Sequence, residues 1–204
     1  MVTIVLQLIA LGIAVILHEV AHGWVAEKCG DPTARLMGRI TLNPLAHIDP
    51  IGSVILPLAL LFFKSRFIIG WAKPVPVNFQ ALRHPKRDMI WVSLAGPGVN
   101  IILALISVLL LRIGIINPDS LLYIFLINLA GINLVLAVFN LIPIPPLDGS
   151  KILIGLLPMP LAVLYSRLEP FGMFFILLLL MSGFFSMLIV PIITILARLI
   201  GVPL

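Results

Sequence analysis

The sequence is short of cysteine, of charge and of long polar segments. Its single cysteine, Cys29, excludes an internal disulfide bond. Only 10% of the 204 residues are charged, whereas soluble domains carry about 25%, so an ordinary soluble protein is excluded. The longest polar stretch, Lys64–Asp88, is too short to form a second folded unit, and we expect a single domain over residues 1–204.

Hydrophobic residues make up 61% of the chain, and the mean hydropathy is +1.23. The apolar runs are long and continuous, and only helices and closed barrels can cross a bilayer. The runs lack the two-residue alternation of barrel strands. We therefore expect an all-α polytopic membrane protein with about four to six transmembrane or re-entrant helices and a short membrane-associated β or extended region.

Four apolar runs are long enough to cross a bilayer. We expect helices over residues 2–28, 89–111 and 121–142, and a C-terminal hydrophobic helix over 171–200 that is kinked at Pro191.

Two further segments have a weaker pattern. Ile51–Phe63 is short and interrupted by Pro57. It is either re-entrant or a span extended by Lys64 and Arg66, whose long side chains reach the interface. Thr33–Pro50 alternates weakly between polar and apolar residues, which indicates a strand or hairpin.

The basic residues lie mainly in two loops. Lys28–Arg39 holds three Lys/Arg and Lys64–Arg87 holds six, of 13 in the chain. Basic loops stay in the cytoplasm and contact anionic lipid. We therefore expect both loops on that side and the N-terminus outside, provided that Ile51–Phe63 does not cross. No nucleic-acid partner is expected.

Two histidines and a glutamate stand at the end of an apolar run, in His18-Glu19-Val20-Ala21-His22. A charged group at membrane depth costs about 2.5–3.5 kcal/mol on insertion scales, so such residues usually face an interior site. Positions i and i+4 share one helix face, so both imidazoles can reach one metal ion. Glu19 lies beside that face, where it could deprotonate a water without being a ligand. This is the H-E-x-x-H arrangement of zinc hydrolases.

A third metal ligand is expected, because catalytic zinc usually has three protein ligands and an open position for water. Asp148 is the strongest candidate. It follows a proline-broken backbone, Pro143–Pro146, which is tolerated at membrane depth only inside protein or beside a wet cavity. The alternative for Asp148 is a cap on a short helix over Ser150–Leu157. The other candidates are Glu27, His47, Asp49, Asp88, Asp119 and Glu169.

Four segments form a recognisable set. They are His18–Gly23 (HEVAHG), Gly70–Asn78 (GWAKPVPVN), Ser93–Asn100 (SLAGPGVN) and Asn140–Gly149 (NLIPIPPLDG). In order and spacing they resemble the motifs of the site-2 proteases, the intramembrane zinc metalloproteases. The resemblance covers about residues 12–155 and is to a compact form, since the 204 residues leave no room for a PDZ insert or a CBS tail.

The resemblance implies one Zn²⁺ per chain, held by His18, His22 and Asp148. It makes Glu19 the catalytic base. Asn140 would help to hold the substrate strand or the developing oxyanion, whereas its alternative role is a polar cap on backbone freed by the prolines that follow.

The resemblance also implies a substrate-binding surface near the site. Its predicted members are Lys73, Pro74, Val75, Pro76, Asn78, Asn100 and Asn140. The segment Gly70–Asn78 would pair with an unwound substrate strand, and a plain linker is its alternative. Asn100 has an alternative in close helix packing. His47 and Asp49 are either an accessory metal pair or, more simply, a surface turn.

These features predict a zinc-dependent endopeptidase that hydrolyses peptide bonds in or near transmembrane helices. Its expected partners are substrate helices and the lipid bilayer, and its expected location is a prokaryotic inner membrane, with the site toward the cytoplasm. The alternatives are a metal-ion transporter, a catalytically inactive relative and a structural bundle. Glu19 argues against a transporter, because it lies where a catalytic base is needed. The complete set of metal and base residues argues against an inactive relative. The ionisable groups in the membrane argue against a structural bundle, which would have no use for them.

Overall fold

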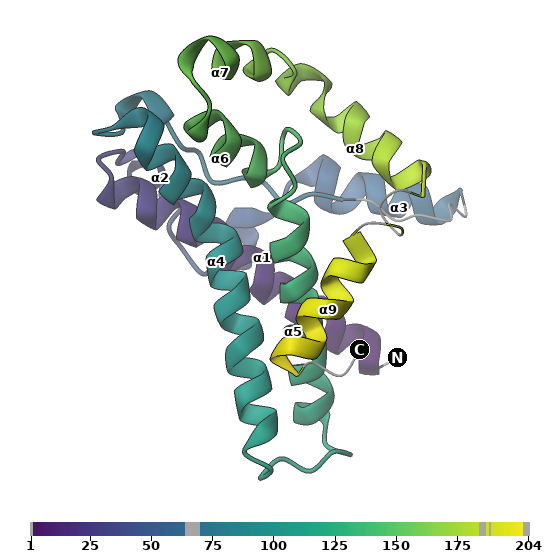
Figure 1. Ribbon diagram of the computed structural model, residues 1–204. Helices are drawn as coiled ribbons and strands as arrows, with labels where there is room; N and C mark the ends of the chain where they lie inside the picture. Colours follow the sequence, from purple (N-terminus) through teal and green to yellow (C-terminus); the bar gives the residue numbers. More distant parts are fainter. Residues whose placement is uncertain (1, 64–69, 184–186, 188, 202–204) are drawn as a thin grey trace.

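The protein is a bundle of helices (Figure 1). The computed structural model describes residues 2–63, 70–183, 187 and 189–201, and no β-strand occurs among them. Within these residues, four helical segments are long and apolar enough to cross a membrane. They are Val2–Lys28 (α1), Pro85–Arg112 (α4), Leu121–Asn140 (α5) and Met159–Met181. The last of these joins α7 (Met159–Ser166), a 3-10 turn (Glu169–Phe171) and α8 (Gly172–Met181). The expected all-α membrane architecture is confirmed.

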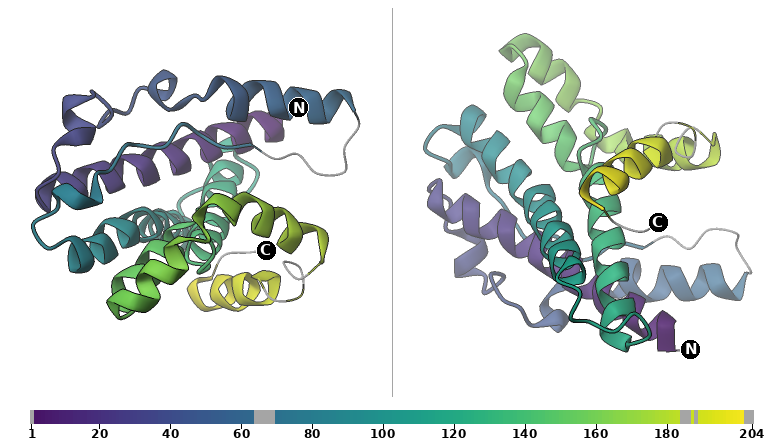
Figure 2. Two further views of the ribbon diagram at one scale, coloured as in Figure 1. Left: turned by 90° about the horizontal axis from the view of Figure 1, so that it is seen from above. Right: turned by 60° about the horizontal axis from the view of Figure 1, so that its bottom comes forward.

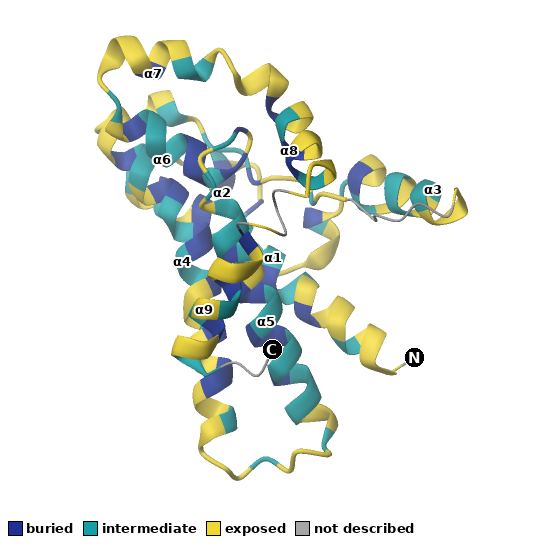
Figure 3. Ribbon diagram, turned by 45° about the vertical axis from the view of Figure 1, so that its right-hand side comes forward, coloured by how far each residue is buried: buried dark blue, intermediate teal, exposed yellow. Residues whose placement is uncertain are grey.

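Helices α1, α4 and α5 pack together, and α1 crosses the other two obliquely (Figures 1 and 2). Small side chains line the buried faces, which lets helix backbones approach closely within a membrane. These small buried residues are Ala10, Ala14, Gly23 and Ala26 of α1, Gly96 and Ala104 of α4, and Ala130 and Ala137 of α5. Outward-facing side chains such as Leu8, Leu109 and Leu122 are exposed and apolar, as lipid contact requires (Figure 3).

A tight turn after α5 brings the chain back toward α1. Helix α5 ends at Asn140, and α6 spans Asp148–Leu156. A Cβ at Gly149 would lie 2.2 Å from the carbonyl oxygen of Leu141, so only glycine fits where the first turn of α6 packs on the end of α5. This close approach fixes the position of Asp148.

The C-terminal apolar run is two helices, so the prediction of one kinked helix over 171–200 was wrong. Helix α8 spans Gly172–Met181, and Gly183 follows it with a φ of 73°. Helix α9, Val190–Ile200, has Pro191 in its first turn, where the missing N–H group has no helical partner to lose. Ile193 of α9 packs in one apolar cluster with residues of α4 and α5.

The expected strand or hairpin over Thr33–Pro50 is also absent from the structure. The segment instead forms a short helix, Thr33–Leu36 (α2), and a 3-10 helix, Pro44–His47 (η1). Asn43 accepts a hydrogen bond from the N–H of Leu45 at the start of η1. Such side-chain bonds to the local backbone outweigh a weak polar alternation. The β or extended region is therefore not confirmed as β structure.

The short apolar segment after η1 is helical. It consists of a π-helical segment, Pro50–Ile55 (η2), and helix α3, Leu56–Phe62. Together they are shorter than the four candidate spans. Lys64 and Arg66 lie outside the described residues, so both alternatives for this segment stay predictions.

Candidate active site

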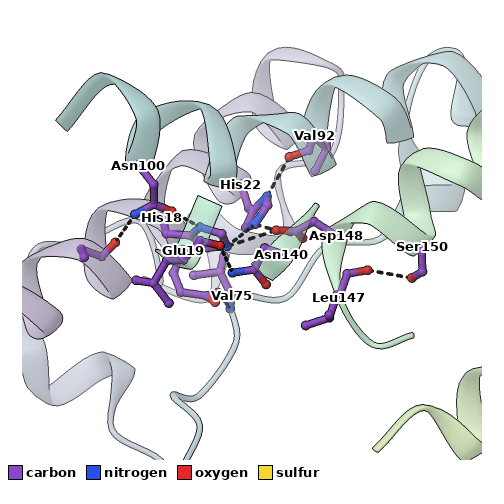
Figure 4. A network of polar contacts seen from close by, with 12 residues as sticks. His18, Glu19, His22, Val75, Val92, Asn100, Asn140, Leu147, Asp148 and Ser150 are labelled. Carbon is purple, nitrogen blue, oxygen red and sulfur yellow. Dashed lines mark hydrogen bonds and ion pairs between the residues drawn. The ribbon is translucent and has the colours of Figure 1, made fainter. Parts of the chain in front are cut away.

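Two histidines on α1 and one aspartate on α6 converge inside the bundle (Figure 4). The Nε2 atoms of His18 and His22 are 3.0 Å apart. Asp148 places Oδ2 3.1 Å from His18 Nε2 and Oδ1 3.3 Å from His22 Nε2. One ligand atom from each residue falls within 4.8 Å of the others, so the three could hold a metal ion.

The other ring nitrogens of the histidines face hydrogen-bond acceptors. His18 Nδ1 lies 2.6 Å from Asn100 Oδ1, and His22 Nδ1 lies 2.7 Å from the carbonyl oxygen of Val92. A carbonyl oxygen can only accept, so each Nδ1 carries the hydrogen. The Nε2 lone pairs then point toward each other and toward Asp148, which is the tautomer that ligates a metal through Nε2.

This arrangement of lone pairs fits a cation. Asp148 Oδ2 is buried and has no hydrogen-bond partner, and leaving a buried acceptor unpaired costs about 1–3 kcal/mol or more. With both Nε2 atoms unprotonated, the carboxylate faces two imidazole lone pairs. A metal ion held by the three side chains would remove the repulsion. The alternative helix-cap role for Asp148 is not seen, since the N-cap position of α6 is Leu147.

The other candidates for the third ligand have different surroundings. Glu27 pairs with Arg35, Glu169 pairs with Lys151, and Asp49 accepts hydrogen bonds from backbone N–H groups at the start of η2. The remaining ones are His47, which bonds the carbonyl of Thr41, Asp88, which accepts from the N–H of His84, and Asp119, which is exposed. Over the described ranges, no second cluster of three potential ligands occurs.

Cys29 takes no part in this cluster. It packs against the small apolar group of Ala26, Leu82 and Val92. Burial raises the pKa of the Cys29 thiol, which makes it a packed side chain and not a reactive one.

Glu19 is held by a segment distant in sequence. The N–H of Val75 donates to Glu19 Oε2 at 2.7 Å. Val75 is buried against α1, because a Cβ at Gly23 would lie 2.9 Å from the Val75 side chain. The segment is also fixed further along, where the N–H of Asn78 donates to Asp31 Oδ2 at 2.6 Å. The structure thus brings the Gly70–Asn78 segment beside the expected catalytic base.

The predicted substrate-binding residues have very different exposure. Lys73, Pro74 and Asn78 are exposed, Pro76 and Asn140 are half-buried, and Val75 is buried. Asn140 lies among the site residues in Figure 4 and donates from Nδ2 to the carbonyl oxygen of Leu136 at 3.0 Å. Asn100 is 0% exposed and bonded to His18, so its side chain offers no surface to a substrate.

Two groups near the histidines are not predicted from the sequence. They are the carbonyl of Val92 and the side chain of Asn133, which bonds Asn100. Close helix packing at Gly96 was expected, and a Cβ there would meet both histidine rings. A backbone carbonyl has no signature in a sequence. Asn133 had one, since a polar residue in the apolar run 121–142 is a marker of an interior site.

Replacing Gly96 with alanine should lower the affinity for zinc. A Cβ at Gly96 would lie 2.4 Å from His22 Nε2 and 2.6 Å from His18 Nε2. The methyl group would push α4 or the rings out of place, and disturbed surroundings of a metal ligand typically cost about 10–100-fold in affinity. Competition with a chromogenic chelator measures this loss in the purified protein.

Gly98→Ala is the matched control for Gly96→Ala. It lies on the same helix, and a Cβ there meets nothing within 4 Å. We expect its zinc affinity to equal that of the wild type. Equal affinities in both alanine variants would show that α4 does not approach the histidines this closely.

Three potential metal ligands inside a bundle of apolar helices, with a glutamate beside the first histidine, are the arrangement expected of a metallopeptidase built into membrane helices. The chain matches peptidase family M50 over residues 6–117 and 113–183, and it belongs to that family. This match confirms the class expected from the sequence, a membrane metalloendopeptidase that uses Zn²⁺.

Similar proteins carry names of the same kind. The chain is 36% identical over 190 residues to "Putative zinc metalloprotease YwhC" of Bacillus subtilis, which covers 90% of this chain and 83% of that protein. It is 32% identical over 137 residues to "Putative zinc metalloprotease Rip2" of Mycobacterium tuberculosis, covering 67% of this chain and 51% of that one. It is 34% identical over 149 residues to "Putative zinc metalloprotease MJ0611" of Methanocaldococcus jannaschii, covering 73% and 69%. No solved structure matches.

Proposed function

We propose that the protein is a zinc-dependent intramembrane endopeptidase that hydrolyses peptide bonds in or near the transmembrane helices of other membrane proteins. The observation that carries this proposal is the depth of the site. His22 and His18 precede Lys28 on α1 by six and ten residues, which is about 9 Å and 15 Å along a helix. A peptide bond that reaches them must itself enter the membrane.

In this proposal His18, His22 and Asp148 hold the metal. A bound zinc ion supplies Lewis acidity to a water molecule and to the scissile carbonyl. Glu19 takes the proton from that water and later delivers it to the leaving amine. The Val75 N–H holds Oε2 of Glu19, so the carboxylate is oriented while its second oxygen serves the water.

Asn140 is proposed to assist at the developing oxyanion. One N–H of its amide group is used by the carbonyl of Leu136. A primary amide has two N–H donors, so the second is available to a substrate oxygen. A donor aimed at the charge that forms in the transition state typically contributes about 10²–10³ in rate.

The substrate strand is proposed to run along the segment from Lys73 to Asn78. This segment passes over Glu19 and presents the exposed residues Lys73 and Pro74. The donor at Val75 is already used by Glu19. Pairing with an added strand therefore relies on other backbone groups, such as those of Val77.

We further propose that the site faces the cytoplasm of a prokaryotic cell. The basic loop after α1, the start of α4 and helix α6 lie at one end of the bundle, opposite the loop between α4 and α5 (Figure 1). Basic residues mark the cytoplasmic side, and this is the end of α1 that His22 is nearer to.

A test of this function varies the helix of a single-span model substrate. Two glycines at its cytoplasmic end should raise cleavage by about 30-fold over two leucines, because each glycine weakens a helix by close to 1 kcal/mol and about 1.4 kcal/mol corresponds to a factor of ten. A stable helix hides its carbonyls in its own hydrogen bonds, so it must unwind before hydrolysis. Cleavage is measured with purified enzyme in excess, by the appearance of the shorter fragment.

The same two glycines at the opposite end of the substrate helix are the control. They should leave cleavage at the level of the leucine substrate. Equal cleavage of all substrates would show that unwinding does not limit the reaction. Stimulation only by the distal pair would reverse the proposed orientation.

A further inference from the structure

Three side chains connect the metal site to the middle of the bundle. Asn133 of α5 donates from Nδ2 to the carbonyl oxygen of Leu129 at 2.8 Å. Asn100 of α4 donates from Nδ2 to Asn133 Oδ1 at 2.6 Å. Asn100 Oδ1 in turn lies 2.6 Å from His18 Nδ1. Both asparagines are 0% exposed, so the contacts are shielded from water and from lipid.

The carbonyl of Leu129 determines which way each amide in this series of hydrogen bonds is oriented. The Leu129 carbonyl only accepts, so Asn133 must turn its amino group toward it and its oxygen toward Asn100. Asn100 must then turn its amino group toward Asn133 and its oxygen toward His18. The amino group of Asn100 also lies 3.3 Å from the carbonyl oxygen of Ala14, which favours the same orientation. His18 consequently carries its hydrogen on Nδ1 and keeps Nε2 free.

The bond from Asn133 to the backbone of its own helix does not explain why its side chain also contacts Asn100. Asn128, also on α5, donates to the carbonyl of Ile124 at 2.7 Å in the same i−4 pattern. Asn128 lines an apolar groove with Leu11 and Leu136, whereas Asn133 is aimed at Asn100. The two asparagines therefore share the backbone bond and differ in the connection to the histidine.

We propose that Asn133 is a positioning residue for the metal ligand His18. It fixes the orientation of the Asn100 amide and, through that amide, the ring tautomer that ligates through Nε2. Asn133 is not among the three potential metal ligands, and it acts through Asn100. The inference rests on His18 being a zinc ligand, as in the proposed function.

The first test measures zinc affinity of the purified full-length chain by chelator competition. Asn100→Leu removes the direct partner of His18 and should weaken binding by about 10–100-fold. Asn133→Leu should weaken it by about tenfold, since the Ala14 carbonyl still holds the Asn100 amino group in part. Asn128→Leu, the matched control, should bind zinc as the wild type does.

A double-mutant cycle distinguishes an effect of Asn133 that passes through Asn100 from a general loss of packing. If Asn133 acts through Asn100, adding Asn133→Leu to Asn100→Leu should weaken zinc binding no further. Asn133→Thr should restore most of the affinity, because its hydroxyl donates to the i−4 carbonyl and still accepts from Asn100. If Asn133→Leu does not fold, Asn133→Ala takes its place in the cycle.

A spectroscopic measurement reports the tautomer itself. In the metal-free wild type, nitrogen NMR of labelled histidine should show His18 protonated on Nδ1, and Asn133→Leu should show a mixture of both ring tautomers. Wild-type zinc affinity and an unchanged tautomer in Asn133→Leu would overturn the proposal. So would an equal loss in Asn128→Leu, or additive losses in the cycle. Failure of the proposed function looks different, because the wild type itself would then bind no zinc that depends on His18.

Discussion

Glu19→Gln should retain about one zinc ion per chain and cleave substrate about 10²–10⁴ times more slowly than the wild type. The carboxylate is not among the three groups that converge on the metal position, so its loss leaves the ligands intact. Glutamine is similar in size and can still meet the Val75 N–H with its oxygen, which preserves the contact seen at 2.7 Å. What it lacks is the basicity needed to take a proton from water.

The measurement pairs zinc content, by atomic emission, with cleavage of the glycine-containing substrate. Glu27→Gln is the matched control, because Glu27 lies on the same helix and pairs with Arg35 at the surface. It should keep both zinc and full activity. Near-normal cleavage by Glu19→Gln would rule out Glu19 as the base. Such a result would favour the alternative functions, a metal-ion transporter or a catalytically inactive relative that only binds substrates.

His22→Ala and Asp148→Ala should each abolish stoichiometric zinc binding. The full apparent binding free energy of a zinc site is about 10–16 kcal/mol. Loss of one of three protein ligands should therefore cost about 3–5 kcal/mol, which is about 10²–10⁴-fold in affinity. In Asp148→Ala, the Nε2 atoms of His18 and His22, which lie 3.0 Å apart, are the only two of the three proposed ligand atoms that remain.

Asp119→Ala provides the comparison for these two variants. Asp119 is exposed and stands outside the cluster, so its removal should leave zinc content unchanged. Zinc content is determined after purification in detergent and dialysis against a weak chelator. Full occupancy in Asp148→Ala would mean that another group supplies the third ligand.

The convergence of His18, His22 and Asp148 could be predicted from the sequence for a physical reason. Helical periodicity alone places residues i and i+4 on one face, which determines the histidine pair. Asp148 followed because prolines at membrane depth require an interior environment. Three of the long apolar runs correctly predicted the spans α1, α4 and α5, because only helices and closed barrels can cross a bilayer.

Other features depend on tertiary contacts that a single sequence does not encode locally. The bond from Val75 to Glu19 joins a backbone group to a side chain 56 positions away. The Asn100–Asn133 contact depends on the register in which α4 packs against α5. The break before α9 was missed because the apolar run is continuous in composition, although Gly183 and Pro191 mark an end and a start. The predicted hairpin over Thr33–Pro50 was wrong because side-chain bonds to the local backbone, such as the one that Asn43 accepts from Leu45, outweighed the weak alternation of polar and apolar residues.

The origin of the three proposed ligands in two distant parts of the chain has a thermodynamic consequence. His18 and His22 belong to the first helix, and Asp148 begins helix α6, whose first turn packs on the end of α5. An unfolded chain does not assemble this set, so zinc binds the folded state in preference and stabilises it. At a free zinc concentration 100 times the dissociation constant, the gain is about 2.7 kcal/mol. An ion held by the three proposed ligands would thus also join the N-terminal and C-terminal halves, and chelation should destabilise the whole bundle as well as stop hydrolysis.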